Sequence, residues 1–231
     1  MTIKGSNVLL AGASGAIGSS LYSCLESMGA DILAISSKAG HDMQLDLTKE
    51  YSIEKLRGHL SYTFVPDIII CCSGILHDDE TLPEKKLADF TSDWFLKSVD
   101  MNILTHVNLA KAVDPLIEKT RPVTWVSLSA MVGSISDNRL GGWYTYRMTK
   151  AALNMFVKGL SIEWHRKSKG STVISIHPGT TDSQMSKPFS IRKDKLYSPQ
   201  LTAERIISVV ENLSADNNGS FFNWNGYEIE W

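Results

Sequence analysis

A tyrosine and a lysine four positions apart, Tyr146 and Lys150, are the residues best suited to chemistry in this sequence. Side chains four residues apart lie on one face of a helix, so the phenol and the ammonium would be neighbours. A free phenol, with a pKa of about 10, is a poor acid or base at neutral pH, whereas a cation one turn away favours the phenolate. Such a phenol can give a proton to a carbonyl oxygen or take one from an alcohol. Tyr144 has no lysine four residues further on, which favours Tyr146; taken alone, the motif is also explained by a chance pair on a solvated helix face.

A glycine-rich turn near the N-terminus offers a place for phosphate groups. It reads GASGAIG over residues 12–18 and directly follows an apolar run over 7–11. Glycines admit positive φ and let a pyrophosphate approach the backbone, and a helix N-terminus supplies free N–H groups. The spacing is G-x-x-G-x-x-G, which a plain tight turn explains equally well when it stands alone. Its position after the first predicted strand favours dinucleotide binding.

The second apolar run, over 32–35, ends in Ser36-Ser37-Lys38. An acid at this point would accept a hydrogen bond from the ribose 2′-OH of NAD, but no acid is present. Two hydroxyls and a cation are better suited to the 2′-phosphate of NADP. The sequence therefore predicts a preference for NADP(H) over NAD(H), with an ordinary polar strand end as the alternative.

Strand and helix patterns alternate along almost the whole chain and would position these residues. Nearly continuous apolar runs, typical of strands buried on both faces, cover 7–11, 32–35, 67–72, 123–129, 172–177 and 221–224. Stripes at helical spacing cover 17–28, 99–113, 153–164 and 206–213. The alternation predicts a doubly wound α/β fold: a parallel sheet with helices on both faces, three layers deep, in a single domain over residues 1–231. Such sheets bind ligands at the carboxyl ends of their strands, which is where the candidate residues fall.

Composition restricts the partners. The 231 residues carry a net charge of −2, which gives no electrostatic footprint for nucleic acid or for an anionic membrane surface. No apolar run approaches membrane-spanning length, and the N-terminus lacks the pattern of a secretory signal. Three cysteines fit neither a disulfide framework nor a zinc site, and the histidines show no metal-like spacing. We expect a cytoplasmic protein that acts on a small molecule and holds no metal.

Five motifs in the right order resemble the short-chain dehydrogenase/reductase family over almost the whole chain. They are the glycines of 12–18, Cys71-Cys72-Ser73-Gly74 in place of Asn-Asn-Ala-Gly, Asn102, the Tyr146–Lys150 motif and Pro178-Gly179. The segments LPEK over 82–85 and GGWY over 141–144, together with the Trp-ended tail, resemble the C-factor and sniffer-like carbonyl reductase branch. The resemblance implies a Rossmann fold and a nicotinamide cofactor.

The resemblance also implies roles for individual residues. Tyr146 would be the general acid/base, Lys150 would lower its pKa and hold the nicotinamide ribose, and Asn102 would anchor a proton relay through water. The Asp46-Leu47 pair after a short third strand would contact adenine, and Thr180 or Thr181 would touch the carboxamide. The predicted cofactor-binding residues are Gly12, Ser14, Gly15, Ile17, Gly18, Ser36, Ser37, Lys38, Asp46, Leu47, Ser73, Gly74, Tyr146, Lys150, Pro178, Gly179, Thr180 and Thr181. Self-association as a homodimer or homotetramer would use the helices that contain Asn102 and Lys150.

Two departures from the family pattern matter. Both asparagines of the Asn-Asn-Ala-Gly element are lost, and Ala130 stands where the family has its catalytic serine. Ser129 is adjacent and Ser134 lies four residues further on; we favour Ser129, with Ser134 second, and a third reading is that no serine acts. Neighbouring strand residues point to opposite faces, so Ser129 can substitute only where the strand end is irregular.

The predicted reaction is the NADP-dependent reduction of a ketone or aldehyde, or its reverse. The segment 182–199 is expected to form a mobile lid whose aromatic and apolar residues suit an apolar substrate body, while its cations either meet an acidic group or are solvated. The alternative is a cofactor-bound signalling or scaffold protein of the same fold with little turnover, which the two departures leave open. A sugar-nucleotide epimerase is a weaker alternative, because those enzymes carry a larger C-terminal substrate region.

Overall fold

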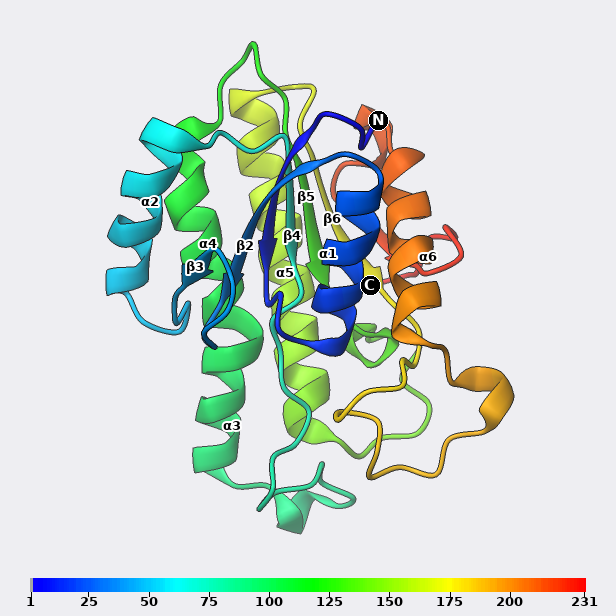
Figure 1. Cartoon of the computed structure of the whole chain (residues 1–231). Coiled ribbons are helices and arrows are strands. Elements are labelled where there is room, and N and C mark those ends of the chain that lie inside the picture. The colour runs from blue at the N-terminus through cyan, green and yellow to red at the C-terminus, as the bar shows by residue number, and fades with distance from the viewer. Residues whose placement is uncertain (1) are drawn as a thin grey trace.

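The computed structural model describes residues 2–231, with the side chains of 61–63 left aside. Seven strands form one sheet in the order β3-β2-β1-β4-β5-β6-β7, and every neighbouring pair is parallel (Figure 1). The strands are β1 (Asn7–Ala11), β2 (Asp31–Ser36), β3 (Met43–Gln44), β4 (Ile68–Cys71), β5 (Thr124–Leu128), β6 (Thr172–His177) and β7 (Phe221–Asn223). The order reverses direction next to β1, so the predicted doubly wound sheet is confirmed.

The described residues form six α-helices. They are α1 (Ala16–Ser27), α2 (Tyr51–Thr63), α3 (Ser92–Val99), α4 (Thr105–Val113), α5 (Tyr144–Lys167) and α6 (Pro199–Glu211). Leucines and isoleucines of α1 and α6 share a core with Val8, Leu10 and Ile174, whereas those of α2, α4 and α5 share the opposite core with Leu9 and Ile69. Alternate residues of one strand therefore face different helix layers, as the pleat of a strand requires.

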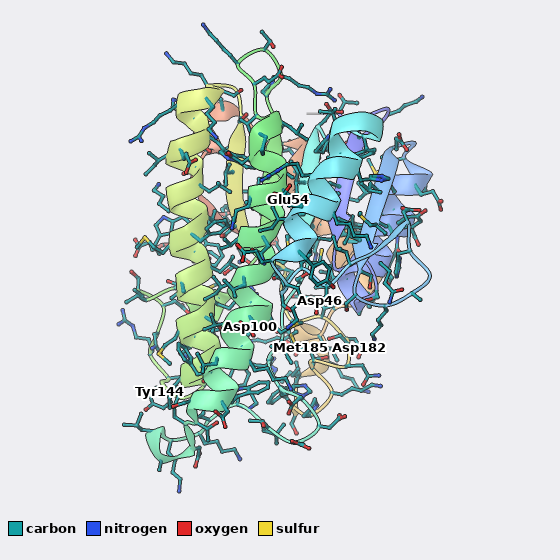
Figure 2. The ribbon with its side chains drawn as sticks, turned by 90° about the vertical axis from the view of Figure 1, so that its left-hand side faces the viewer. Asp46, Glu54, Asp100, Tyr144, Asp182 and Met185 are labelled. Atoms are coloured by element: carbon teal, nitrogen blue, oxygen red, sulfur yellow. The ribbon has the colours of Figure 1, made fainter. Side chains whose placement is uncertain are left out.

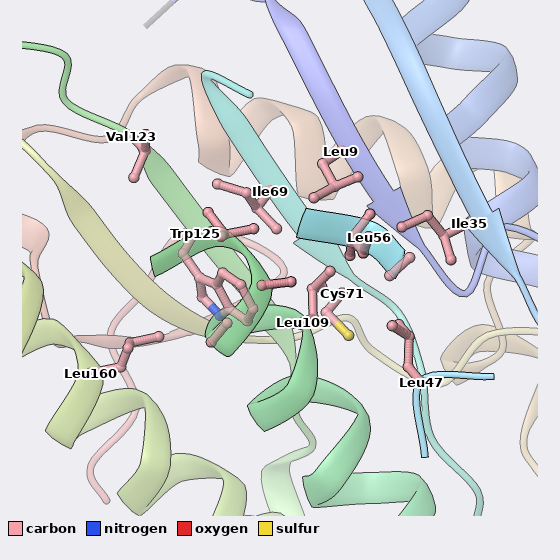
Figure 3. Packing of buried hydrophobic residues seen from close by; sticks show 14 of the residues in the cluster. Leu9, Ile35, Leu47, Leu56, Ile69, Cys71, Leu109, Val123, Trp125 and Leu160 are labelled. Carbon is pink, nitrogen blue, oxygen red and sulfur yellow. The ribbon is translucent and has the colours of Figure 1, made fainter. Parts of the chain in front are cut away.

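A tryptophan pair organises the core beneath the helix that carries Tyr146. Trp125 of β5 is fully buried (Figure 3). Its ring meets that of Trp164 of α5 edge-on, with 5.6 Å between the ring centroids. The indole N–H of Trp125 donates to Ser127 Oγ at 2.8 Å, so the polar edge of the ring is satisfied inside the core. Since Trp125, Ser127 and Ser129 alternate with Val126 and Leu128, all three face α5.

The stripe over 99–113 is helical throughout, as predicted, but its helical register changes within it. The helix α3 ends at Val99, a π-helical turn runs over Asp100–Leu104, and α4 follows. A π turn adds a residue to the helical register, and such turns occur often at functional sites. The turn carries Asn102, whose side chain forms hydrogen bonds with the loop after β4.

Within residues 2–231, none of the helices combines the length and the apolar character that a membrane crossing requires.

Candidate active site

Two cavities lie at the carboxyl ends of the strands and together collect most of the predicted residues. The first, of about 340 Å³, is lined by Tyr146, Ser129, His177, Ile17 and the turn 178–181, among others. The second, of about 360 Å³, is lined by the predicted residues Gly12, Ser14, Gly15, Ser36, Ser37, Lys38, Asp46, Leu47, Ser73 and Gly74, among others. Three predicted residues do not line either cavity: Gly18, Asn102 and Lys150. Segments far apart in the chain thus meet at one edge of the sheet.

The glycine turn leaves open space beside α1. Gly12 has φ +78°, and a Cβ there would lie 2.9 Å from the backbone N of Ser73. A Cβ on Gly18 would lie 2.2 Å from Gly12 O, which explains why this position, under the turn rather than at the cavity, is also glycine. Gly15 caps α1 without any side-chain hydrogen bond, so no side chain covers the first N–H groups of the helix. These residues fit a pyrophosphate at the helix N-terminus.

The far end of the second cavity is polar. Ser36 is buried and donates from Oγ to Ser14 Oγ at 2.8 Å, while the N–H of Lys38 donates to Ser36 Oγ at 3.0 Å. Ser37 and Lys38 are exposed, so their side chains can meet a phosphate at the rim. Asp46 accepts two hydrogen bonds from Thr48, which hold its carboxylate in a turn at the cavity edge.

The loop after β4 keeps its glycine because two functional side chains press on it. A Cβ on Gly74 would lie 2.9 Å from Asn102 Oδ1 and 3.3 Å from Lys150 Nζ. The amide of Asn102 makes three hydrogen bonds: Oδ1 accepts from the N–H of Ile75 at 2.7 Å, and Nδ2 donates to Ile75 O and to Thr149 Oγ1 at 2.9 and 3.0 Å. Asn102 therefore joins this loop to α5.

Lys150 lies beneath the ring of Tyr146. Its Nζ donates to the carbonyl oxygen of Leu128 at 2.8 Å and lies 5.8 Å from the centroid of the Tyr146 ring. Burial lowers the pKa of Lys150 to about 8, although the Cys71 and Cys72 thiols act in the opposite direction. Burial raises the pKa of the Tyr146 phenol above its ordinary value. This direction is opposite to the expected one, because removal of the phenol from water outweighs a lysine whose ammonium is engaged by a backbone carbonyl.

The segment 182–199 covers the first cavity. Met185 and Phe189 line the cavity, and Phe189 lies against Trp143 with 5.1 Å between the ring centroids. Figure 2 shows Asp182 and Met185 at the same end of the molecule as Asp46 and Tyr144. The lid cations Lys187, Arg192, Lys193 and Lys195 are exposed and do not line this cavity.

The chain resembles known oxidoreductases in both sequence and fold. Residues 5–206 match the family model described as enoyl-(acyl carrier protein) reductase. The chain is 28% identical over 236 residues to 1-hydroxy-2-glutathionyl-2-methyl-3-butene dehydrogenase of a Rhodococcus strain, an alignment that covers 98% of this chain and 100% of that one. It is 31% identical over 210 residues, 85% of this chain and 78% of the other, to an uncharacterised oxidoreductase of Saccharomyces cerevisiae.

The chain belongs to the short-chain dehydrogenase/reductase family. Its fold superposes on the NADPH-bound carbonyl reductase from chicken fatty liver with a TM-score of 0.84, at 20% identity and over 99% of this chain and 95% of the other. Membership confirms the resemblance drawn from the five motifs and makes the chain an NAD(P)-dependent oxidoreductase that transfers hydride. Nothing in these comparisons favours the signalling or scaffold alternative.

The two serines proposed in place of the family's serine lie in different surroundings. Ser134 Oγ donates to the carbonyl oxygen of Glu230 and accepts from the N–H of Asp137, so it is committed to the C-terminal tail. Ser129 lines the first cavity, and its Oγ is buried without a hydrogen-bond partner among the described residues. Ala130 lines the same cavity, because the chain turns directly after β5 into a 3₁₀ turn over Met131–Gly133. The geometry leaves Ser129 as the better candidate.

A buried histidine that the sequence did not single out fixes the altered Asn-Asn-Ala-Gly element. The ring of His106 on α4 is fully buried, with Nδ1 3.0 Å from Ser127 Oγ and Nε2 3.2 Å from Ser73 O. Burial, assisted by the charge of Lys150, lowers the pKa of His106 to about 3. The neutral ring ties the cavity loop to β5. A single histidine without a spaced partner carries no sequence signal, so this role became visible only from the fold.

Glu84 caps the helix that carries Tyr146. Its carbonyl oxygen accepts from the N–H of Trp143 at 2.6 Å, and both carboxylate oxygens lie 3.3 Å from the N–H of Thr145. The side chain is 3% exposed. Trp143 adopts φ +49°, an unusual conformation for a residue with a side chain, and Glu84 holds it there. The LPEK segment thus acts on the first turn of α5.

We predict that Glu84→Ala lowers the free energy of unfolding by about 2 kcal/mol, because it leaves a buried N–H without its charged acceptor. Glu84→Gln keeps an acceptor and is expected to lose less. Glu80→Ala, at an exposed glutamate of the same loop, is the control and should change stability by less than about 0.5 kcal/mol. Urea denaturation of the three variants measures this order, and equal stability of Glu84→Ala and Glu80→Ala would contradict the capping role.

Proposed function

We propose that this chain reduces uncharged ketones or aldehydes with NADPH, and that Tyr146 gives the proton to the carbonyl oxygen. The observation that carries the proposal is the single cavity lined by both Tyr146 and Ser129, next to a second cavity whose glycine turn suits a dinucleotide. The nicotinamide, when bound, supplies the hydride. The side chains of the protein itself bind the substrate and donate the proton.

The substrate class follows from the lining of the first cavity. Among the described residues that line it there is no Asp, Glu, Lys or Arg. The large side chains are apolar or aromatic: Leu76, Met131, Trp143, Met185, Phe189 and Ile191. An ionised group would lose its hydration here without gaining a charged partner, whereas an apolar body would gain by burial. The exposed lid cations are interpreted as solvated rather than as a site for an acid.

The protonation state of the phenol agrees with the proposed reduction. Because burial raises the pKa of Tyr146, the phenol keeps its proton at neutral pH and is ready to donate it from Oη. Oxidation of an alcohol needs the phenolate, which the same burial disfavours. The Lys150 ammonium is the nearby charge that stabilises the phenolate left after donation. The protonated phenol and the ammonium beside it support the reductive step that we propose.

We predict that Tyr146→Phe lowers kcat for carbonyl reduction by about 100- to 10,000-fold, because the proton donor is lost while the ring remains. Binding of NADPH, followed by fluorescence, should change little. Tyr144→Phe, two residues away on the same helix turn, is the matched control and should keep wild-type turnover. Equal background rates in the wild type and Tyr146→Phe would instead support a scaffold protein with little turnover.

A charge reversal tests the cofactor preference. Lys38→Asp places a carboxylate where the 2′-phosphate is expected, and we predict that kcat/KM for NADPH falls about 10- to 100-fold while that for NADH does not fall, as expected for the loss of one charged contact. Lys55→Asp makes the same charge change at an exposed position of α2 and serves as the control. A wild-type preference for NADH, or an unchanged NADPH/NADH ratio in Lys38→Asp, would exclude the assignment.

The lowered pKa of Lys150 sets a pH limit. Since the ammonium is present below its pKa of about 8 and lost above it, we predict that kcat for reduction is flat near pH 7 and falls as pH rises through about 8. Lys150→Arg keeps a charge over this range, so whatever activity it retains should no longer fall there. A wild-type profile that stays flat to a pH of about 10, near the pKa of an ordinary lysine, would contradict a role for this ammonium.

We propose further that the protein self-associates as a homodimer or homotetramer through α4 and α5. The exposed apolar side chains Met148, Met155 and Ile162 on α5 support this surface. Sedimentation velocity gives the mass, and a monomer at micromolar concentration would exclude this self-association.

We propose the cytoplasm as the place of action. The three cysteines are free thiols, which supports a reducing compartment. Cell fractionation tests this location.

A further inference from the structure

Two residues that line the substrate cavity, Ser129 and His177, each carry a buried polar atom without a hydrogen-bond partner among the described residues: Ser129 Oγ and His177 Nδ1. Buried polar atoms are nearly always paired in proteins, so an unpaired one calls for an explanation. Two such residues in the lining of one cavity indicate a place prepared for a polar group of a ligand. His177 has no role in the proposed function so far.

The sheet register places these two residues side by side. Leu128 of β5 pairs with Ile176 of β6, and the N–H of Ser129 donates to Ile176 O at 2.8 Å, so the ladder continues one step beyond β5. Ser129 therefore stands opposite His177. Partners in a parallel pair project to the same face of the sheet, and this is the face that α5 covers. Ser129, His177 and Tyr146 of α5 thus converge on one cavity.

The imidazole of His177 is neutral under ordinary conditions. Burial lowers its pKa to about 4, so at neutral pH the ring has one N–H and one lone pair. A neutral ring in this position can donate a hydrogen bond to a substrate oxygen without bringing a positive charge into the cavity. Its neighbour Ser129 offers a hydroxyl that can donate in the same way. Neither Ser129 Oγ nor His177 Nδ1 is engaged by a described residue.

We propose that Ser129 and His177 together hold the substrate oxygen that Tyr146 protonates, and that this pair replaces the single serine of the family, whose position is occupied here by Ala130. The inference rests on the proposed reduction of a carbonyl. Both groups donate hydrogen bonds to the oxygen, on which negative charge develops as hydride reaches the carbon; the proton then comes from Tyr146 Oη. No bond forms to Ser129 or His177, and neither is oxidised or reduced.

Three substitutions at His177 separate hydrogen bonding from packing. His177→Asn places an amide near the position of Nδ1, His177→Gln places it near Nε2, and His177→Leu fills the space without a polar atom. With NADPH and 4-nitrobenzaldehyde or cyclohexanone as probes, we expect His177→Leu to lower kcat by about 10-fold or more. His177→Asn should retain several-fold more activity than His177→Gln, because Nδ1 is the unpaired atom. A role confined to packing would not produce this order.

Ser175→Ala is the matched control. Ser175 lies two residues before His177 on the same face of β6, and its Oγ is also buried without a partner among the described residues, but it does not line the cavity. Its removal should leave kcat unchanged. The NADPH dissociation constant and the thermal midpoint, measured for every variant, should match the wild type within about two-fold and a few degrees respectively.

Two combined variants test whether Ser129 and His177 together replace the family's serine. Ser129→Ala with His177→Leu should lose little more activity than the worse single variant, because groups that act as a unit are not additive. Adding Ala130→Ser to Ser129→Ala should restore kcat by about 10-fold or more, since it returns a hydroxyl to the family's position. Multiplicative losses in the first case, or no recovery in the second, would overturn the pairing.

The outcome also separates this inference from the proposed function. If Tyr146→Phe is inactive while folded His177→Leu has wild-type kcat, the reductase stands and the Ser129–His177 pair is wrong. If Tyr146→Phe turns over as fast as the wild type, both the proposed function and the Ser129–His177 pair are wrong. Loss of activity in His177→Leu and Tyr146→Phe, with Ser175→Ala active, supports both.

Discussion

A buried ammonium is the constraint around which the active site is built. Lys150 is 4% exposed, and its Nζ donates to the carbonyl oxygen of Leu128 at the end of β5. Burial of a charge is costly unless polar groups compensate it, so the surroundings of Nζ are closely specified. A Cβ on Gly74 would lie 2.9 Å from Asn102 Oδ1 and 3.3 Å from Nζ, and a Cβ on Gly133 would lie 2.9 Å from the backbone of Lys150. The end of β5, the loop after β4 and the turn after β5 thus all pack against Lys150.

Around this cation, the other titratable groups are kept neutral. Burial lowers the pKa of His106 to about 3 and that of His177 to about 4, and it raises the pKa of Cys71 to about 11. The surroundings of Tyr146 thus hold one positive charge, whereas Lys38 and Asp46 line the second cavity, where the phosphates of a dinucleotide would lie. The surroundings of Tyr146 suit a carbonyl, whose oxygen becomes negative only during the reaction. The electrostatics therefore agree with the family of the chain and with the first cavity, where none of the described lining residues is an acid, a lysine or an arginine.

How much of this could be predicted from the sequence depends on the distance between partners along the chain. Tyr146 and Lys150 were predictable because helix periodicity brings them together, and the glycine turn because it directly follows a strand. The choice between Ser129 and Ser134 was not, because it depends on where β5 ends and on a contact with Glu230. The surroundings of His106 and His177 are built from neighbouring strands, which a single sequence does not reveal. The pKa direction of Tyr146 was wrong because burial outweighs a neighbouring charge that the spacing alone suggested.

Transfer of label from cofactor to product tests the central claim most directly. The protein would be mixed with NADPH carrying deuterium at both C4 positions and with 4-nitrobenzaldehyde, and the alcohol analysed by mass spectrometry. A Tyr146–Lys150 site that reduces carbonyls with NADPH predicts one deuterium on the carbinol carbon of every alcohol formed, with one cofactor oxidised for each. Unlabelled alcohol, or oxidation of the cofactor without formation of alcohol, would contradict the account.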